Sequence, residues 1–147
     1  GVELTAGLSW SPDGTRIAYT RWTCEIFQLV VEDVNSGEIQ VVQDSININS
    51  LPMWSPDGTR IAFTISVQSE WRALYLWDTR TNERTGLIGV DQHVIVNSPS
   101  WSPDGETLAF LSTETRLSLY TIDIHSRDLH RITPDQLSLI SAAQWRP

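Results

Sequence analysis

The chain has little or none of several residue types, and each shortage narrows what it can do. Among its 147 residues there is one cysteine, Cys24, and there is no lysine, so all ten basic residues are arginine. A single cysteine excludes an intrachain disulfide and a thiolate metal cluster. Because unpaired cysteines are usually buried, we expect Cys24 to be a small core residue. No apolar run reaches the length of about 18 residues that a membrane-spanning helix requires.

Positive charge is also scarce. The formal net charge is −8, and the arginines form no basic cluster. An acidic surface repels phosphate groups, which argues against nucleic-acid binding and against attachment to an anionic membrane. The hydrophobic fraction of 40% is nevertheless that of a globular protein with a real core.

Recognisable catalytic motifs are missing as well. The sequence has no G-x-S-x-G nucleophile elbow, no P-loop and no G-x-G-x-x-G. His93, His125 and His130 are scattered. His125 and His130 could meet across one short turn, but two histidines without a third ligand make a poor zinc site. We therefore expect no catalytic residue, no metal and no cofactor, and we predict that the protein is not an enzyme.

What the sequence does contain is a repeat. "WSPDGTRIAYT" (10–20) returns as "WSPDGTRIAFT" (54–64), as "WSPDGETLAF" (101–110) and, degenerately, as "WRP" (145–147). The intervals between the four tryptophans are 44, 47 and 44 residues, and a second marker, Leu-x-x-x-Asp, recurs every 45 residues and ends at Asp33, Asp78 and Asp123. A period in this range is typical of repeat architectures.

Each repeat predicts four short strands. "PDG" is a turn signal, and β-branched and aromatic stretches such as "TRIAFT" follow it. The next stretches, "IFQLVV" (26–31) and "ALYLW" (73–77), do not alternate polar and apolar residues, so both faces of these strands should be covered. Four-stranded sheets covered by neighbours on both sides are the blades of a β-propeller. We predict an all-β propeller segment over 1–147, with blades at 7–43, 51–89 and 99–133 and a closing strand at 141–146.

The motif "WSPDGxxIAF" followed by "LYxxD" resembles the WD40-like (PD40) repeat of TolB-like β-propellers, which also occurs in propeller domains of prolyl-oligopeptidase-type peptidases. The resemblance covers nearly the whole chain. The first unit departs mildly, with "LVVED", and the last unit has Arg146 in place of serine. The resemblance implies a six-bladed ring and an extracytoplasmic location, periplasmic or secreted.

Three blades do not close a ring. The bare end faces of a three-blade arc would be apolar, and at roughly 25 cal/mol per Å² several hundred Å² of such surface forfeits on the order of 10 kcal/mol. Two solutions are open. Two chains can form a six-bladed ring as a homodimer, which is our prediction, or the chain is the C-terminal half of a larger propeller protein, such as a receptor or a peptidase.

The repeat motif and the variable loops fall on opposite rims of the predicted blades. The motif rim carries the "SPDG" turns and the turns near Asn35, Thr81 and Ser126. The variable rim carries the loops 20–25, 66–72 and 112–116 and the connections between blades. Repeats keep their turns for folding and vary where they bind, so we predict partner binding at the variable rim, through Arg21, Trp22, Glu25, Glu70, Trp71, Arg72, Glu114 and Arg116. The alternative is that both tryptophans pack under loops and the charged residues are solvated.

Residues that recur with the motif have a structural interpretation. The tryptophans are expected to pack between blades, and the aspartates and glycines to form Asx-type turns. Calcium binding by the aspartates is a weaker alternative, because one carboxylate per turn is too few. The motif residues are Trp10, Asp13, Gly14, Trp54, Asp57, Gly58, Trp101, Asp104, Gly105 and Trp145.

These observations predict a non-enzymatic module that binds a protein or peptide across the variable rim and the central channel. A small-ligand enzyme with a site in the channel is an alternative, but it would need convergent carboxylates or histidines on inner strands that carry Trp, Ser and Gln instead. A third possibility is a scaffold with no ligand.

Overall fold

The computed structural model describes residues 3–44, 51–67, 71–89, 94–113 and 117–133. The regular secondary structure within these ranges consists of β-strands alone. The strands form three four-stranded antiparallel sheets, each built from strands that are consecutive in the sequence. The predicted all-β fold with four-stranded blades is therefore confirmed.

The strands are assigned to blades in chain order. Blade I contains β1 (Glu3–Trp10), β2 (Arg16–Trp22), β3 (Phe27–Asp33) and β4 (Ile39–Asp44). Blade II contains β5 (Met53–Trp54), β6 (Arg60–Val67), β7 (Trp71–Asp78) and β8 (Arg84–Ile88). Blade III contains β9 (Asn97–Trp101), β10 (Thr107–Ser112), β11 (Ser118–Asp123) and β12 (Leu129–Arg131). The predicted closing strand at 141–146, with Trp145, lies outside the described residues.

Some strands are longer than the sequence suggests. β1 begins at Glu3 rather than at residue 7, with two register shifts around Ala6. Trp22 is the last residue of β2, and Trp71 is the first residue of β7. The prediction that both tryptophans lie in loops is wrong, because cross-strand pairing continues to the Trp22–Phe27 and Val67–Trp71 pairs.

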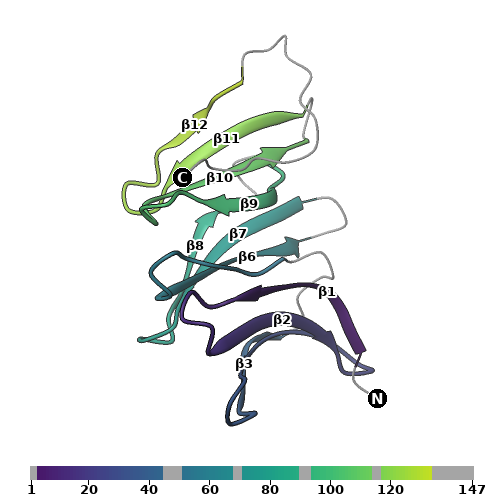
Figure 1. The fold of residues 1–147 in the computed structure, drawn as a ribbon. Coiled ribbons are helices and arrows are strands. Elements are labelled where there is room, and N and C mark those ends of the chain that lie inside the picture. Colours follow the sequence, from purple (N-terminus) through teal and green to yellow (C-terminus); the bar gives the residue numbers. More distant parts are fainter. Residues whose placement is uncertain (1–2, 45–50, 68–70, 90–93, 114–116, 134–147) are drawn as a thin grey trace.

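The three blades stack face to face in chain order (Figure 1). Their first strands are neighbours, and hydrogen bonds connect them. The Trp54 backbone N–H donates to Ser9 Oγ (3.2 Å), and the Trp101 indole Nε1–H donates to the Met53 carbonyl (3.0 Å). The two rims are also separated as expected: the motif turns lie at one end of the blades, and the β2–β3 turn lies at the other (Figure 1).

Each blade has a first face, which carries the motif tryptophan, and an opposite second face. The first face of blade II packs on the second face of blade I, and the first face of blade III packs on the second face of blade II, so two separate apolar cores form. First-face residues are bulky, whereas each second face supplies a small alanine among aliphatic residues. The first core joins Trp54, Ile61, Phe63 and Trp77 to Ala18, Leu29, Val31 and Val42. The second joins Trp101, Leu108, Phe110 and Ile122 to Ala62, Leu74, Leu76 and Leu87.

A core substitution tests this packing. Phe63 is fully buried between blades I and II, so Phe63→Ala should lower the free energy of unfolding by about 3–5 kcal/mol through lost burial and a residual cavity. Val34, which is 42% exposed, serves as the control, and Val34→Ala should change stability by less than ~0.5 kcal/mol. Urea unfolding followed by tryptophan fluorescence measures both. Similar losses for the two variants would contradict the assigned packing.

Candidate interaction surfaces

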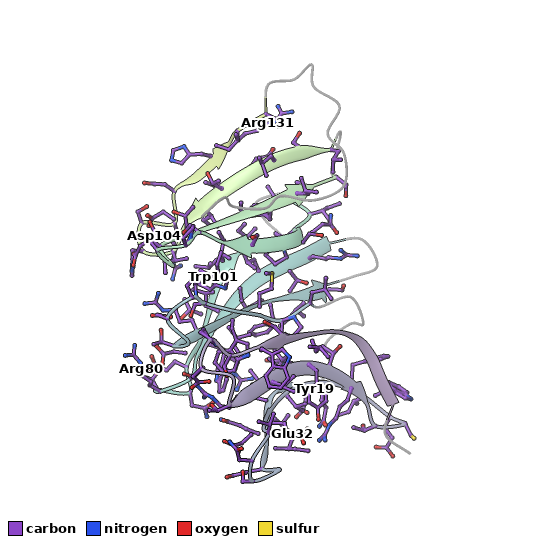
Figure 2. The ribbon with its side chains drawn as sticks, in the orientation of Figure 1. Tyr19, Glu32, Arg80, Trp101, Asp104 and Arg131 are labelled. Carbon is purple, nitrogen blue, oxygen red and sulfur yellow. The ribbon has the colours of Figure 1, made fainter. Side chains whose placement is uncertain are left out.

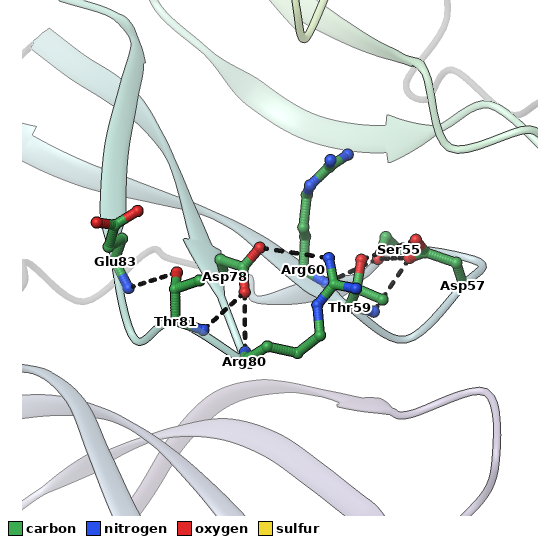
Figure 3. A network of polar contacts seen from close by, with 8 residues as sticks. All are labelled: Ser55, Asp57, Thr59, Arg60, Asp78, Arg80, Thr81 and Glu83. Atoms are coloured by element: carbon green, nitrogen blue, oxygen red, sulfur yellow. Dashed lines mark hydrogen bonds and ion pairs between the residues drawn. The ribbon is translucent and has the colours of Figure 1, made fainter.

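The motif aspartates are engaged within their own turns, and Figure 3 shows this for Asp57 of blade II. In blade II, Asp57 accepts hydrogen bonds from Ser55 Oγ (2.5 Å), the Thr59 backbone N–H (3.0 Å) and Thr59 Oγ1 (2.7 Å). Gly58 completes the turn at φ 70°, a conformation that suits glycine. Asp13 and Asp104 accept the equivalent serine and backbone hydrogen bonds in blades I and III. The predicted Asx-type turn is therefore present in all three blades.

The second set of aspartates closes the neighbouring turns on the same rim. Asp78 Oδ1 accepts the backbone N–H groups of Arg80 (2.8 Å) and Thr81 (3.0 Å), and its other oxygen lies 3.8 Å from the Arg80 guanidinium (Figure 3). The Thr79 N–H donates to the Thr59 carbonyl (2.9 Å), which ties the two turns together. Within the described ranges, no three His, Cys, Asp or Glu side chains gather closely enough to hold a metal ion.

These contacts lower the pKa of the turn aspartates. The hydrogen bond from Ser11, followed by that from the Thr15 backbone, lowers the pKa of Asp13 to about 2. The Ser102 hydroxyl lowers the pKa of Asp104 in the same way, and backbone N–H donors lower that of Asp33. All three carboxylates accept hydrogen bonds that favour the charged form. The motif rim thus carries a row of aspartate carboxylates that are kept in the charged form by hydrogen bonds from their own turns.

The histidines do not form a cluster among the described residues. His125 Nε2 lies 2.7 Å from Glu106 Oε2, and both side chains are more than half exposed. His130 is exposed on β12 and pairs with Thr121 of β11, which places it on the second face of blade III. His93 lies outside the described residues.

The structure accounts for several of the residues predicted to bind a partner. Trp22 is half-buried against Phe27, with ring centroids 4.4 Å apart, and Arg21 Nε donates to Gln28 Oε1 (3.0 Å). Arg72 donates to Asn97 and so connects blade II to blade III. Glu25 is exposed at the end of the β2–β3 turn.

Three of the other predicted binding residues, Glu70, Glu114 and Arg116, lie outside the described residues. Trp71 is the first residue of β7, and only its backbone is described. Of the eight residues, Arg21 and Trp22 lie on opposite faces of β2, Glu25 lies in the turn that follows, and Arg72 connects two blades.

Cys24 is exposed, so the prediction that it is a core residue is wrong. It lies in the β2–β3 turn with a positive φ of 69°. The turn lies beyond the ends of β2 and β3, outside the two apolar cores that join the described blades.

The two ends of the stack expose residues that the other blades bury. The motif tryptophan Trp10 is 52% exposed, whereas Trp54 and Trp101 are 6% and 7% exposed. At the opposite end, Ile132 is 54% exposed, although the equivalent Val42 and Leu87 are both 4% exposed. Within one chain Trp10 does not pack between blades, because no described residue covers the first face of blade I as blades I and II cover the blades that follow them. Whether Trp10 is covered in a closed ring stays a prediction.

The uncovered first face of blade I also carries a polar pair. Glu32 occupies the position of the buried Trp77 and Ile122, immediately before the repeated aspartate. Its carboxylate accepts a hydrogen bond from Tyr19 Oη (2.7 Å). Partial burial and this hydrogen bond raise the pKa of Tyr19 to about 12. Tyr19 and Glu32 lie at one end of the stack, and Arg131 of β12 lies at the other (Figure 2).

The geometry and the repeat match a known family. The model of the TolB β-propeller domain matches residues 3–147. This chain belongs to the TolB β-propeller domain family. No helix among the described residues is long and apolar enough to cross a membrane. No curated protein sequence matches the chain significantly.

Solved structures share the fold of this TolB-family chain. TolB from Acinetobacter baumannii aligns with a TM-score of 0.71 and 23% identity, over 92% of this chain and 33% of that one. The β-propeller domain of the Trilobed protease from Pyrococcus furiosus gives 0.71 and 16%, over 92% and 44%. An oligogalacturonate lyase in complex with manganese gives 0.69 and 17%, over 87% and 41%. The chain thus spans less than half of each of these proteins, and at these identities the likeness concerns the fold alone.

The turn chemistry predicts how Asp13 titrates. Its pKa is lower folded than unfolded, so the stability it contributes is complete above about pH 4, its unfolded pKa, and is lost as the pH falls to about 2. Carboxyl NMR should show Asp13 ionised until about pH 2. Ser11→Ala, which removes the largest cause, should raise the pKa of Asp13 and leave Asp104, which keeps Ser102, as the internal control. An unchanged pKa in that variant would rule out the assigned cause.

Proposed function

We propose that this chain is a non-enzymatic propeller segment that binds a protein or peptide at its variable rim and closes a six-bladed ring by pairing with a second copy. The observation that carries ring closure is the exposure of Trp10 and Ile132 at the two ends of the stack, at positions that the other blades bury. The two ends are complementary. Blade I exposes a first face that no second face covers, and blade III exposes a second face that no first face covers, so the two could form one more contact of the kind seen between blades I, II and III.

Two-fold symmetry satisfies both ends at once. In such a dimer, blade I of each copy covers blade III of the other, and the ring closes with two identical junctions. A longer polypeptide could supply the remaining blades instead, as the partial coverage of the similar structures allows. The dimer is the arrangement in which this chain alone buries both end faces.

Binding at the variable rim is supported by the composition of its blade I end. Trp22 and Phe27 form a half-buried aromatic pair, and Glu25 is exposed in the adjoining turn. Arg21, next to Trp22 in β2, lies on the opposite face of the sheet and donates to Gln28. Aromatic and arginine side chains of this kind are typical anchors of protein interfaces. The motif rim is a poorer candidate, because its carboxylates are used by their own turns.

The proposal of a binding module rather than an enzyme rests on the inner strands. The first strands β1, β5 and β9 contain one acidic residue, Glu3, and no histidine, so they are poor sources of convergent general acids and bases. The likeness to an oligogalacturonate lyase is one of fold and does not transfer its chemistry. We also propose an extracytoplasmic location, which rests on the family resemblance alone.

Ring closure predicts a definite mass. Light scattering of the purified chain should give near twice 16.6 kDa. Trp10→Glu, which places a charge in the proposed junction, should return the mass to that of one chain. Val34→Glu is the matched control, because Val34 is similarly exposed but lies in the turn between β3 and β4, and it should leave the dimer intact. A folded wild-type monomer would refute the dimer and favour blades supplied by a longer chain.

Rim binding predicts a selectable ligand. Selection of a random peptide display library on the immobilised dimer should enrich a consensus peptide. Trp22→Ala should weaken binding of that peptide at least ~10-fold, the scale of an interface anchor. Arg80→Ala, on the motif rim, should leave its affinity unchanged. Failure to enrich any peptide, or equal effects of the two substitutions, would argue against the variable rim as the binding surface.

A further inference from the structure

The junction between blades I and II contains a polar contact that serves as a template for the uncovered ends. Gln40 of β4 lies on the second face of blade I, and its Nε2 donates to Asn82 Oδ1 of blade II (3.3 Å). The same Asn82 oxygen accepts the indole Nε1–H of Trp77 (2.9 Å). Gln40, on the second face of blade I, is therefore linked to Trp77, on the first face of blade II, through the side chain of Asn82.

The repeat identifies the equivalent residues at the two ends. Counted from the repeated aspartate, the position of Gln40 in blade III is His130, and the position of Trp77 in blade I is Glu32. The position of Asn82 in blade I is Gly37, which has the same positive φ, 72° against 61°. A junction between blade III and blade I would therefore have no intervening side chain at that position, which leaves room for the imidazole to contact the carboxylate directly.

The charges at these positions are complementary. Glu32 replaces a buried apolar residue, and its Tyr19 partner occupies only part of the carboxylate's hydrogen-bonding capacity. His130 is exposed on the second face of blade III. An imidazole N–H can donate to a carboxylate in its neutral form and in its charged form.

We propose that Glu32 of one copy accepts a hydrogen bond from His130 of a second copy at each junction of the ring, and that this pair selects the contact of blade I with blade III. The inference rests on the proposed homodimer and extends it by naming the residues that determine how the ring closes. An apolar residue at position 32 would fit any uncovered second face. A carboxylate there favours the one blade that presents an imidazole at the matching position.

A charge exchange tests the pair. Glu32→Arg should weaken the dimer, because it removes the hydrogen-bond acceptor and places a positive charge opposite His130. A loss of about tenfold in affinity at each junction raises the dissociation constant about a hundredfold, because a two-fold dimer has two junctions. Adding His130→Glu should restore the dissociation constant to within about threefold of wild type. Analytical ultracentrifugation at about pH 6.5, near the ordinary pKa of an imidazole, measures the dissociation constant of each variant. Circular dichroism checks that each variant remains folded.

Two matched controls separate this pair from general electrostatics. Glu25→Arg makes the same charge change on an exposed rim residue of blade I, and it should leave the dimer unchanged. Glu32→Arg combined with His125→Glu alters the other described histidine of blade III, which contacts Glu106 instead, and it should not restore dimerisation.

The outcomes distinguish the two proposals. If wild type dimerises but His130→Glu fails to rescue Glu32→Arg, or if His125→Glu rescues equally well, the contact is wrong and the dimer stands. If wild type is monomeric at every concentration tested, both the contact and the dimer are overturned.

Discussion

Each blade has two faces that are shielded from water only when another blade packs on them, and the rest of the structure depends on this constraint. Strands such as β7 are buried on both sides, with Leu74 facing one neighbour and Trp77 facing the other. A four-stranded sheet of this composition has no stable existence in isolation, because either face would expose aromatic and aliphatic side chains to water. Stacking is therefore the source of the fold's stability, and the order of the blades in space follows their order in the chain.

The residues that are most nearly identical among the three units, those of the motif turns, form hydrogen bonds to the backbone. At the motif rim the chain reverses direction twice per blade, and the backbone N–H groups of the turns need acceptors. Asp57 and Asp78 supply them, with hydrogen bonds to Thr59, Arg80 and Thr81. Because each blade has the same two turns, each unit repeats the same two aspartates. Near-identity among the units therefore reflects a shared folding requirement, and function has to be sought where the units differ.

The units differ most informatively at the ends of the stack. Glu32 places a carboxylate where Trp77 and Ile122 are buried, and Trp10 exposes a motif residue that its counterparts bury. In the sequence, Trp10 is an ordinary copy of the motif and Glu32 is one departure among several, so neither residue marks an uncovered face. In the structure they lie on one face, together with Tyr19, and that face is the one to which no described blade is applied. The end faces and the blade I part of the variable rim thus differ in composition. The uncovered first face of blade I exposes Trp10 and carries the Tyr19–Glu32 and Arg21–Gln28 pairs, whereas the rim carries the Trp22–Phe27 pair and Glu25.

The sequence by itself determined the four-stranded blades, their number and their turns, because turn chemistry and strand periodicity are local properties that recur in register with the chain. It did not determine where strands end, so Trp22 and Trp71 were assigned to loops although cross-strand pairing extends to them. It also misplaced Cys24, since burial depends on whether a neighbouring face covers a turn. Only the tertiary structure decided that Trp10 and Ile132 are exposed and that Arg72 connects two blades. The physical reason is that a residue's role in a stacked fold is set by the blade opposite it, which lies some forty residues away in the chain or in a different molecule.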